Sequence, residues 1–292
     1  MRNATIAAAL CAMALQFHAE SRLVVVDVSV RSQSGEAVTN LGREAFTVFE
    51  NGRPQPISIF LGENVPVSVG LVIDNSGSMR DRRPKVEAAA LAFVRASNPM
   101  DEILVINFAD RPRLDVPFTT DAAALDAGIA AGNAIGGTAL RDAIAVGEAH
   151  LVQHARHDRR ILLLLTDGND NASMVSRDQV KKTAAAHGIS IYAIGLPPGD
   201  RSPAGRGRHE LDDLADSTGG LVRHLESLDD ADAAATEIAR QIRQQYTLGY
   251  VPANLDFDGS YRRIRVAVKT PGVTVRTRGG YYATPENMRK EK

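Results

Sequence analysis

Apolar runs alternate with helical stretches through the middle of the chain. Runs such as ILLLL show no alternation with polar residues, which is typical of a central strand that is buried on both faces. Strands that alternate with helices predict an α/β fold with a doubly wound, mostly parallel sheet covered by helices on both faces. The predicted strands are 68–73, 102–108, 160–166 and 190–194, with short edge strands at 113–118 and 221–224. The predicted helices are 85–97, 121–131, 139–155 and 176–187, with weaker ones at 210–217 and 229–245.

Both ends of the chain have a different pattern, in which apolar and polar residues alternate between turns. A strand is expected at 23–30, and the Asn51-Gly52 pair predicts a hairpin between strands at 46–50 and 57–61. Three more strands are expected in 246–284. Because neither set alone makes a stable sheet, we expect both sets to pair in one small accessory β domain, into which the α/β domain is inserted. Two separate β appendages are the alternative.

The first 19 residues have the pattern of a signal peptide. Arg2 precedes an apolar run at 6–15, and small residues follow at Ala12, Ala14 and Ala19. Cleavage after Ala14 and cleavage after Ala19 both remain open. No segment reaches the roughly 20 apolar residues of a membrane-spanning helix. We therefore expect an exported protein, periplasmic, secreted or on the cell surface, without a transmembrane span in its mature form.

Composition and cysteine content exclude several function classes. A net charge of -1 with 24% charged residues gives no bulk attraction to nucleic acid. The single cysteine, Cys11, lies inside the expected signal peptide, so the mature protein has no disulfide, catalytic thiol or cysteine metal ligand. Leu10 precedes it where a lipoprotein needs a small residue. A soluble globular protein is therefore expected.

Oxygen-bearing side chains follow the strand at 68–73, where Asp74, Ser76 and Ser78 surround Gly77. Ligands of open α/β sheets bind at the carboxyl ends of strands, so these side chains stand where a site belongs. A carboxylate with two hydroxyls is a partial shell for a hard cation such as Mg²⁺. The alternative is that one of the serines only caps the next helix.

Two further residues join this set. Asp167 ends the ILLLLTDG strand, and Thr138 precedes a helix in GGTALRDAI. In order and spacing, the five residues resemble the metal-ion-dependent adhesion site of the von Willebrand factor type A (VWFA) family, which has an Asp-x-Ser-x-Ser run, a later Thr and a later Asp. The resemblance covers roughly 66–245 and implies the Rossmann-like fold of that family.

The resemblance implies how the site works. The two Ser and the Thr bind the metal directly, the two Asp bind directly or through water, and one position stays open for a Glu or Asp carboxylate of a protein partner. Mg²⁺ is expected, and Mn²⁺ or Ca²⁺ suits the same oxygen ligands. Asp170 and Asn171 either tune the metal, lie on the partner-facing rim or form a polar loop.

The end segments support a narrower resemblance to secreted bacterial VWFA-related proteins, which concerns architecture and not purpose. The expected organisation is a signal peptide at 1–19, an N-terminal β segment at 20–64, the VWFA domain at 65–245, a C-terminal β segment at 246–284 that pairs with the N-terminal one, and a disordered tail at 285–292.

The expected function is a metal-dependent protein-binding module of the adhesion type, and not an enzyme. A scaffold subunit of an envelope complex is the second reading, and a metal-dependent hydrolase is the third. An external ligand should be lost when the metal is removed, whereas a constitutive subunit should stay with its partner. His150 and His154 are spaced like zinc ligands, but HLVQH lacks the Glu of the HExxH motif, which favours a solvated helix end.

Overall fold

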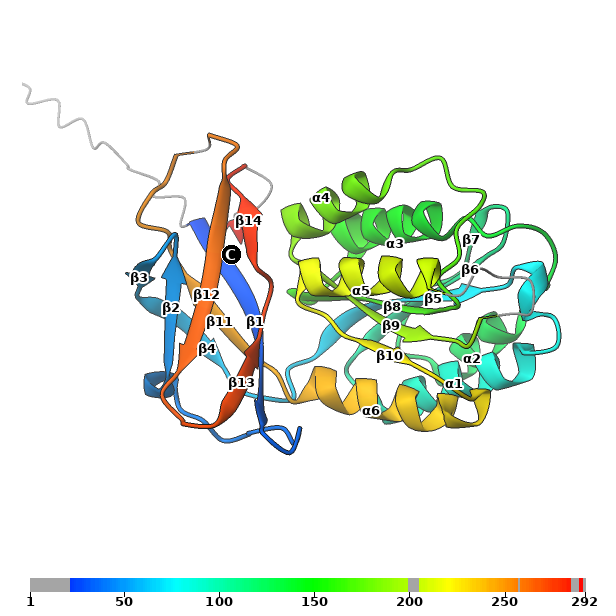
Figure 1. Ribbon diagram of the computed structural model, residues 1–292, viewed down its shortest axis with the longest axis horizontal. Coiled ribbons are helices and arrows are strands. Elements are labelled where there is room, and N and C mark those ends of the chain that lie inside the picture. Colours follow the sequence, from blue (N-terminus) through cyan, green and yellow to red (C-terminus); the bar gives the residue numbers. More distant parts are fainter. Residues whose placement is uncertain (1–21, 199–204, 257, 285–288, 291–292) are drawn as a thin grey trace, which may run out of the picture.

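The computed structural model describes residues 22–198, 205–256, 258–284 and 289–290. The expected signal peptide and most of the expected C-terminal tail lie outside these residues. Figure 1 shows two parts, an α/β domain and a smaller accessory β part that contains the strands from both ends of the chain.

A six-stranded sheet forms the centre of the α/β domain, in the order β10-β9-β8-β5-β6-β7. All neighbouring pairs are parallel except β6 with β7. The predicted mostly parallel sheet is confirmed. Its strands are β5 (Val67–Asp74), β6 (Glu102–Phe108), β7 (Pro112–Thr119), β8 (Arg159–Thr166), β9 (Ile189–Gly195) and β10 (Val222–His224).

Helices cover both faces of this sheet (Figure 1). One apolar core lies between the sheet and α1, α2 and α6, and a second lies between the sheet and α3, α4 and α5. Every residue of β5, β6 and β9 except Ser190 is buried, because both faces of these strands are packed. The helices are α1 (Arg83–Ala96), α2 (Ala122–Ala130), α3 (Leu140–His154), α4 (Arg177–His187), α5 (Arg206–Thr218) and α6 (Ala231–Arg243), with short 3-10 turns η1 (Arg43–Ala45), η2 (Gly77–Met79) and η3 (Leu228–Asp230).

Two antiparallel sheets pack around a third apolar core in the accessory part. Their strand orders are β13-β1-β11-β4 and β14-β12-β2-β3, and β15 pairs with the start of β1. Because β1 pairs with β11 and β2 pairs with β12, the expected pairing of the two chain ends is confirmed. The strands are β1 (Arg22–Ser32), β2 (Phe46–Glu50), β3 (Arg53–Gln55), β4 (Ile57–Leu61), β11 (Tyr246–Tyr250), β12 (Tyr261–Val268), β13 (Val273–Arg276), β14 (Gly280–Tyr282) and β15 (Arg289–Lys290).

Both predicted strands, 46–50 and 57–61, are present as β2 and β4, but the prediction that they pair as a hairpin is wrong. Asn51 and Gly52 do form the turn, with φ of 47° and 82°, but β2 then pairs with the short β3. Pro56 has no N–H to donate, and after it the chain crosses to the other sheet, where β4 pairs with β11. The last expected strand is also divided, since β13 pairs with β1 and β14 pairs with β12.

The chain passes from the accessory part into the α/β domain and back again, and both connections lie at one place. Asn64 lies in the connection into β5, and Arg243 ends α6 just before β11. The Asn64 amide N–H donates to the Arg243 carbonyl at 2.6 Å, and the Arg243 Nε donates to the Asn64 Oδ1 at 3.0 Å. The two connections therefore lie side by side. None of the helices in the described part of the chain has the length and hydrophobicity of a membrane span.

Candidate functional site

The predicted site residues lie at the carboxyl ends of neighbouring strands. Asp74 is the last residue of β5, and Asp167 follows directly after β8. Since β5 and β8 are adjacent and parallel, both carboxylates come to the same edge of the sheet. Both side chains belong to buried residues, with 1% and 6% of their surface exposed. Two acidic groups are thus placed together in a part of the protein that water hardly reaches.

The Asp74 carboxylate is held on both oxygens. The Thr166 hydroxyl donates to its Oδ2 at 2.6 Å, and the Ser76 amide N–H donates to its Oδ1 at 2.9 Å. Burial raises the pKa of Asp74 to about 6, although these hydrogen bonds lower it, and the nearby Asp167 charge raises it further. A cation bound between the two carboxylates would offset this cost and favour the ionised form.

The two serines meet on the loop after β5. The Ser76 and Ser78 hydroxyl oxygens are 3.0 Å apart, with Ser76 buried and Ser78 exposed. Neither caps a helix, since Ser76 precedes η2 without a side-chain cap and α1 begins after Arg82. The capping alternative therefore does not account for these residues.

The loop that carries Thr138 lies against this serine loop. Gly77 donates its N–H to the Gly136 carbonyl at 3.0 Å, and Ile135 donates to the Asn75 carbonyl at 3.1 Å. On the other side, the Asn171 Oδ1 accepts from the Thr138 amide N–H at 2.8 Å. Thr138 is buried between them. The structure thus joins the three loops that contain the five predicted residues.

A buried carboxylate oxygen without a hydrogen-bond partner shows whether this site suits a metal ion. The Asp167 Oδ2 is buried and has no hydrogen-bond partner among the described residues, which is costly for a carboxylate unless something else binds it. Two carboxylates and three hydroxyls form an all-oxygen set that suits Mg²⁺, Mn²⁺ or Ca²⁺. In the described ranges, no three His, Cys, Asp or Glu side chains gather as metal ligands, so hydroxyl oxygens would have to complete the shell. The residues fit a hard divalent cation.

Three residues outside the five predicted ligands support the site, and Thr166 is the one that the sequence did not indicate. Thr166 binds Asp74, and its position one residue before Asp167 is the only signal that the chain offers. Asp170 accepts from the Arg141 amide N–H at 2.9 Å, while Asn171 holds Thr138. Both therefore fix the geometry of the loops around the candidate site.

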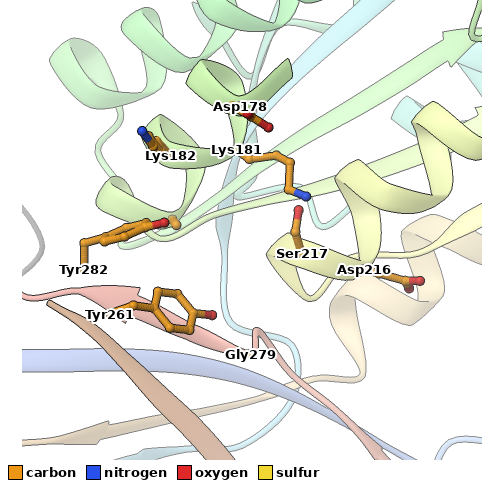
Figure 2. A pocket seen from close by; sticks show the side chains of 9 residues that line it. Asp178, Lys181, Lys182, Asp216, Ser217, Tyr261, Gly279 and Tyr282 are labelled. Carbon is orange, nitrogen blue, oxygen red and sulfur yellow. The ribbon is translucent and has the colours of Figure 1, made fainter. Parts of the chain in front are cut away.

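A separate cleft of about 430 Å³ lies between α4, α5 and the accessory strands (Figure 2). Tyr261 and Tyr282 meet edge to face there, with ring centroids 5.2 Å apart, and Lys181 is paired with Asp213 at 2.7 Å. None of the five predicted site residues lines it. This cleft is distinct from the strand-end site.

Comparison with known proteins identifies the α/β part. Residues 69–169 match the family model of the von Willebrand factor type A domain. Together with the mostly parallel sheet, this match confirms the predicted resemblance to this family over that part of the chain. A search of the curated proteins finds no match.

Solved structures share the fold at low sequence identity. A von Willebrand factor type A protein from Catenulispora acidiphila is 15% identical, with a TM-score of 0.53 over 92% of this chain and 75% of its own. The vWF domain of the type V pili tip protein Mfa5 from Porphyromonas gingivalis is 16% identical, with a TM-score of 0.50 over 61% and 95%. Proximal thread matrix protein 1 from the mussel byssus, with a zinc-occupied metal-ion-dependent adhesion site (MIDAS) motif, is 19% identical. Its TM-score is 0.53 over 65% of this chain and 48% of its own. These likenesses concern the fold alone.

Proposed function

We propose that this is an exported protein that binds a divalent cation at the strand-end site and uses it to capture an acidic residue of a protein partner. Domains of this family are typically protein-interaction modules. Export is inferred from the pattern of the first 19 residues, and the mussel protein with a zinc-occupied MIDAS supports a metal site by analogy. The proposed ligands are Asp74, Ser76, Ser78, Thr138 and Asp167.

The orphaned Asp167 Oδ2 carries this proposal. It is a buried acceptor beside a second carboxylate, and two hydroxyl oxygens stand 3.0 Å apart on the adjoining loop. A divalent cation bound there would act as a Lewis acid with a coordination position for a carboxylate. Because only two of the five ligands are charged, the ion would keep much of its positive charge for the partner. Mg²⁺ is the proposed ion, with Mn²⁺ or Ca²⁺ as the alternatives.

The chain's own residues have two tasks in this mechanism. Thr166 and the Ser76 amide fix the orientation of Asp74, and Asn171 fixes the loop of Thr138. These hydrogen bonds hold the ligand oxygens before binding, which reduces the ordering that binding requires.

The rim of the site favours a protein partner. Ile135 is 67% exposed on the Thr138 loop, and Met174 is 95% exposed on the loop after Asp167. Exposed large apolar side chains around a polar centre are typical of protein-binding surfaces. A scaffold subunit of an envelope complex remains the second proposal, since it would use the same surface. The two proposals differ in whether the partner is released when the metal is chelated.

Metal binding is the first test of the proposal. Calorimetric titration of the mature protein with Mg²⁺ and Mn²⁺ should give saturable binding, and Asp74→Ala or Thr138→Ala should weaken it at least tenfold, because each removes a ligand oxygen. Asp126→Ala, on the exposed side of α2, is the matched control and should leave the affinity unchanged. Absence of saturable binding in the folded wild type would contradict the proposal. Unfolding of both ligand variants in metal-free buffer would instead give these residues a structural role.

A further inference from the structure

A pocket of about 370 Å³ lies beside the candidate metal site. Its wall includes Asn75, Asn107, Arg111, Arg113 and Asn133. Asn75 stands between two of the proposed ligands in the sequence, so this pocket and the metal site share one wall. No proposed metal ligand lines the pocket itself.

Hydrogen bonds fix the position of the pocket relative to the metal site. Asn75 donates its N–H to the Phe108 carbonyl at 2.7 Å, and Ala139 donates to the Ala109 carbonyl at 2.7 Å. The turn between β6 and β7, which carries Arg111, is therefore attached to the loops of both Asp74 and Thr138. In the sheet, Phe108 is the register partner of Asp74. The floor of the pocket is thus one strand away from the metal site, or about 5 Å.

The charges in this pocket favour a carboxylate. The Arg111 side chain is exposed and makes no ion pair or hydrogen bond within the described part of the chain. In contrast, Arg113 pairs with Asp115 at 2.6 Å and donates to the Ala131 carbonyl at 2.8 Å. Arg111 is therefore the guanidinium that is available to a ligand, and a guanidinium matches a carboxylate in a forked arrangement. Asp110 and Asp115 do not line the pocket.

The buried wall of the pocket contains an unsatisfied polar group. Asn75 is 3% exposed, and its Oδ1 has no hydrogen-bond partner among the described residues. Its Nδ2 is already used, because it donates to the Ile73 carbonyl and to the Asn107 Oδ1. The Asn75 Oδ1 is therefore an unsatisfied acceptor behind the wall of the pocket, close to the Arg83 Nη1, which is also buried without a partner among the described residues.

We propose that this pocket binds a second acidic residue of the same partner segment. Alternate side chains of an extended peptide are about 7 Å apart on one face, which is enough to span the step of about 5 Å from the metal site to the floor of the pocket. The partner motif is accordingly two acidic residues separated by one residue, the first on the metal and the second on Arg111. This inference rests on the proposed function, and it adds the sequence of the partner to it.

Two synthetic peptides test this inference in saturating Mg²⁺. One is Ac-Gly-Asp-Gly-Asp-Gly-NH₂, and the other has Asn in place of the second Asp. The wild type should bind the peptide with two Asp about five- to tenfold more tightly, which is the range for a partly exposed charged pair. Arg111→Ala should bring this ratio close to one, and Arg111→Glu should reverse it. Arg95→Ala is the matched control, because Arg95 lies in the last turn of α1 and does not line the pocket.

The outcomes separate the inference from the proposed function. Arg111→Ala should still bind Mg²⁺ saturably, because Arg111 is not among the proposed ligands. Equal binding of the two peptides by the wild type, or an unchanged ratio in Arg111→Ala, would overturn the inference while metal-dependent binding of the Asn peptide still supports the proposed function. If neither peptide binds to the metal-loaded protein, capture of a carboxylate and the inference built on it both fail.

Discussion

Replacing Arg159 with alanine is expected to lower the free energy of unfolding by about 3–5 kcal/mol, the range for breaking a buried ion pair. Arg159 begins β8 and is 1% exposed. Its Nε lies 3.2 Å from the Asp27 Oδ1, and its Nη2 donates to the Ile242 carbonyl at 2.8 Å and to the Gln245 Oε1 at 2.5 Å. Alanine would leave these acceptors without their donor in a buried position.

Urea unfolding followed by circular dichroism measures this loss. Arg156→Ala is the matched control, because Arg156 also pairs with an acidic residue, Glu102 at 3.6 Å, but its side chain is 84% exposed. An exposed pair of this kind contributes about 1 kcal/mol or less. Arg159 belongs to the α/β domain and Asp27 to β1 of the accessory part. An effect of Arg159→Ala as small as that of the control would show that the contact between these two parts does not depend on this arginine.

Replacing Glu148 with glutamine is expected to stabilise the protein by about 3 kcal/mol at pH 7. Glu148 is 1% exposed on α3, and burial raises the pKa of its carboxyl from 4.5 to about 9. The folded state therefore keeps a proton up to about pH 9, whereas the unfolded state releases it above about pH 4.5. Between these values the folded state binds more protons, so its stability falls as the pH rises. Glutamine cannot ionise and removes this dependence.

Unfolding free energies measured from pH 5 to pH 8 test this prediction. The advantage of Glu148→Gln should be small at pH 5 and should grow toward pH 8. Glu36→Gln, at an exposed position of the accessory part, should show no such trend. A constant difference across this range would mean that Glu148 is ionised in the folded protein, with a partner that stabilises its charge.

The fold was predictable where one local signal determines the outcome. The run in β8 is apolar without alternation because both of its faces are packed, so the sequence and the structure agree there. The predicted pairing of 46–50 with 57–61 was wrong because Asn51 and Gly52 determine a turn but not which later strand pairs across it. β4 finds its partner in β11, which lies on the far side of the α/β domain in the sequence. No local pattern contains that pairing.

The same limit holds for the candidate site. The spacing of its polar residues after apolar runs placed all five at strand ends or on the adjoining loops. The orphaned oxygen of Asp167 and the free guanidinium of Arg111 depend on which strands are neighbours. Arg111 lies beside the serine loop only because β6 is next to β5. The sequence around Arg111 contains no motif from which a role could be predicted.

The hydrogen-bonded pair Asn64 and Arg243 lies where the chain passes into the α/β domain and out of it. Because the two ends of the inserted domain touch, the strands before and after it are brought together across one short gap. The accessory sheets can therefore pair strands that are about 180 or more residues apart in the sequence without a long connection in space.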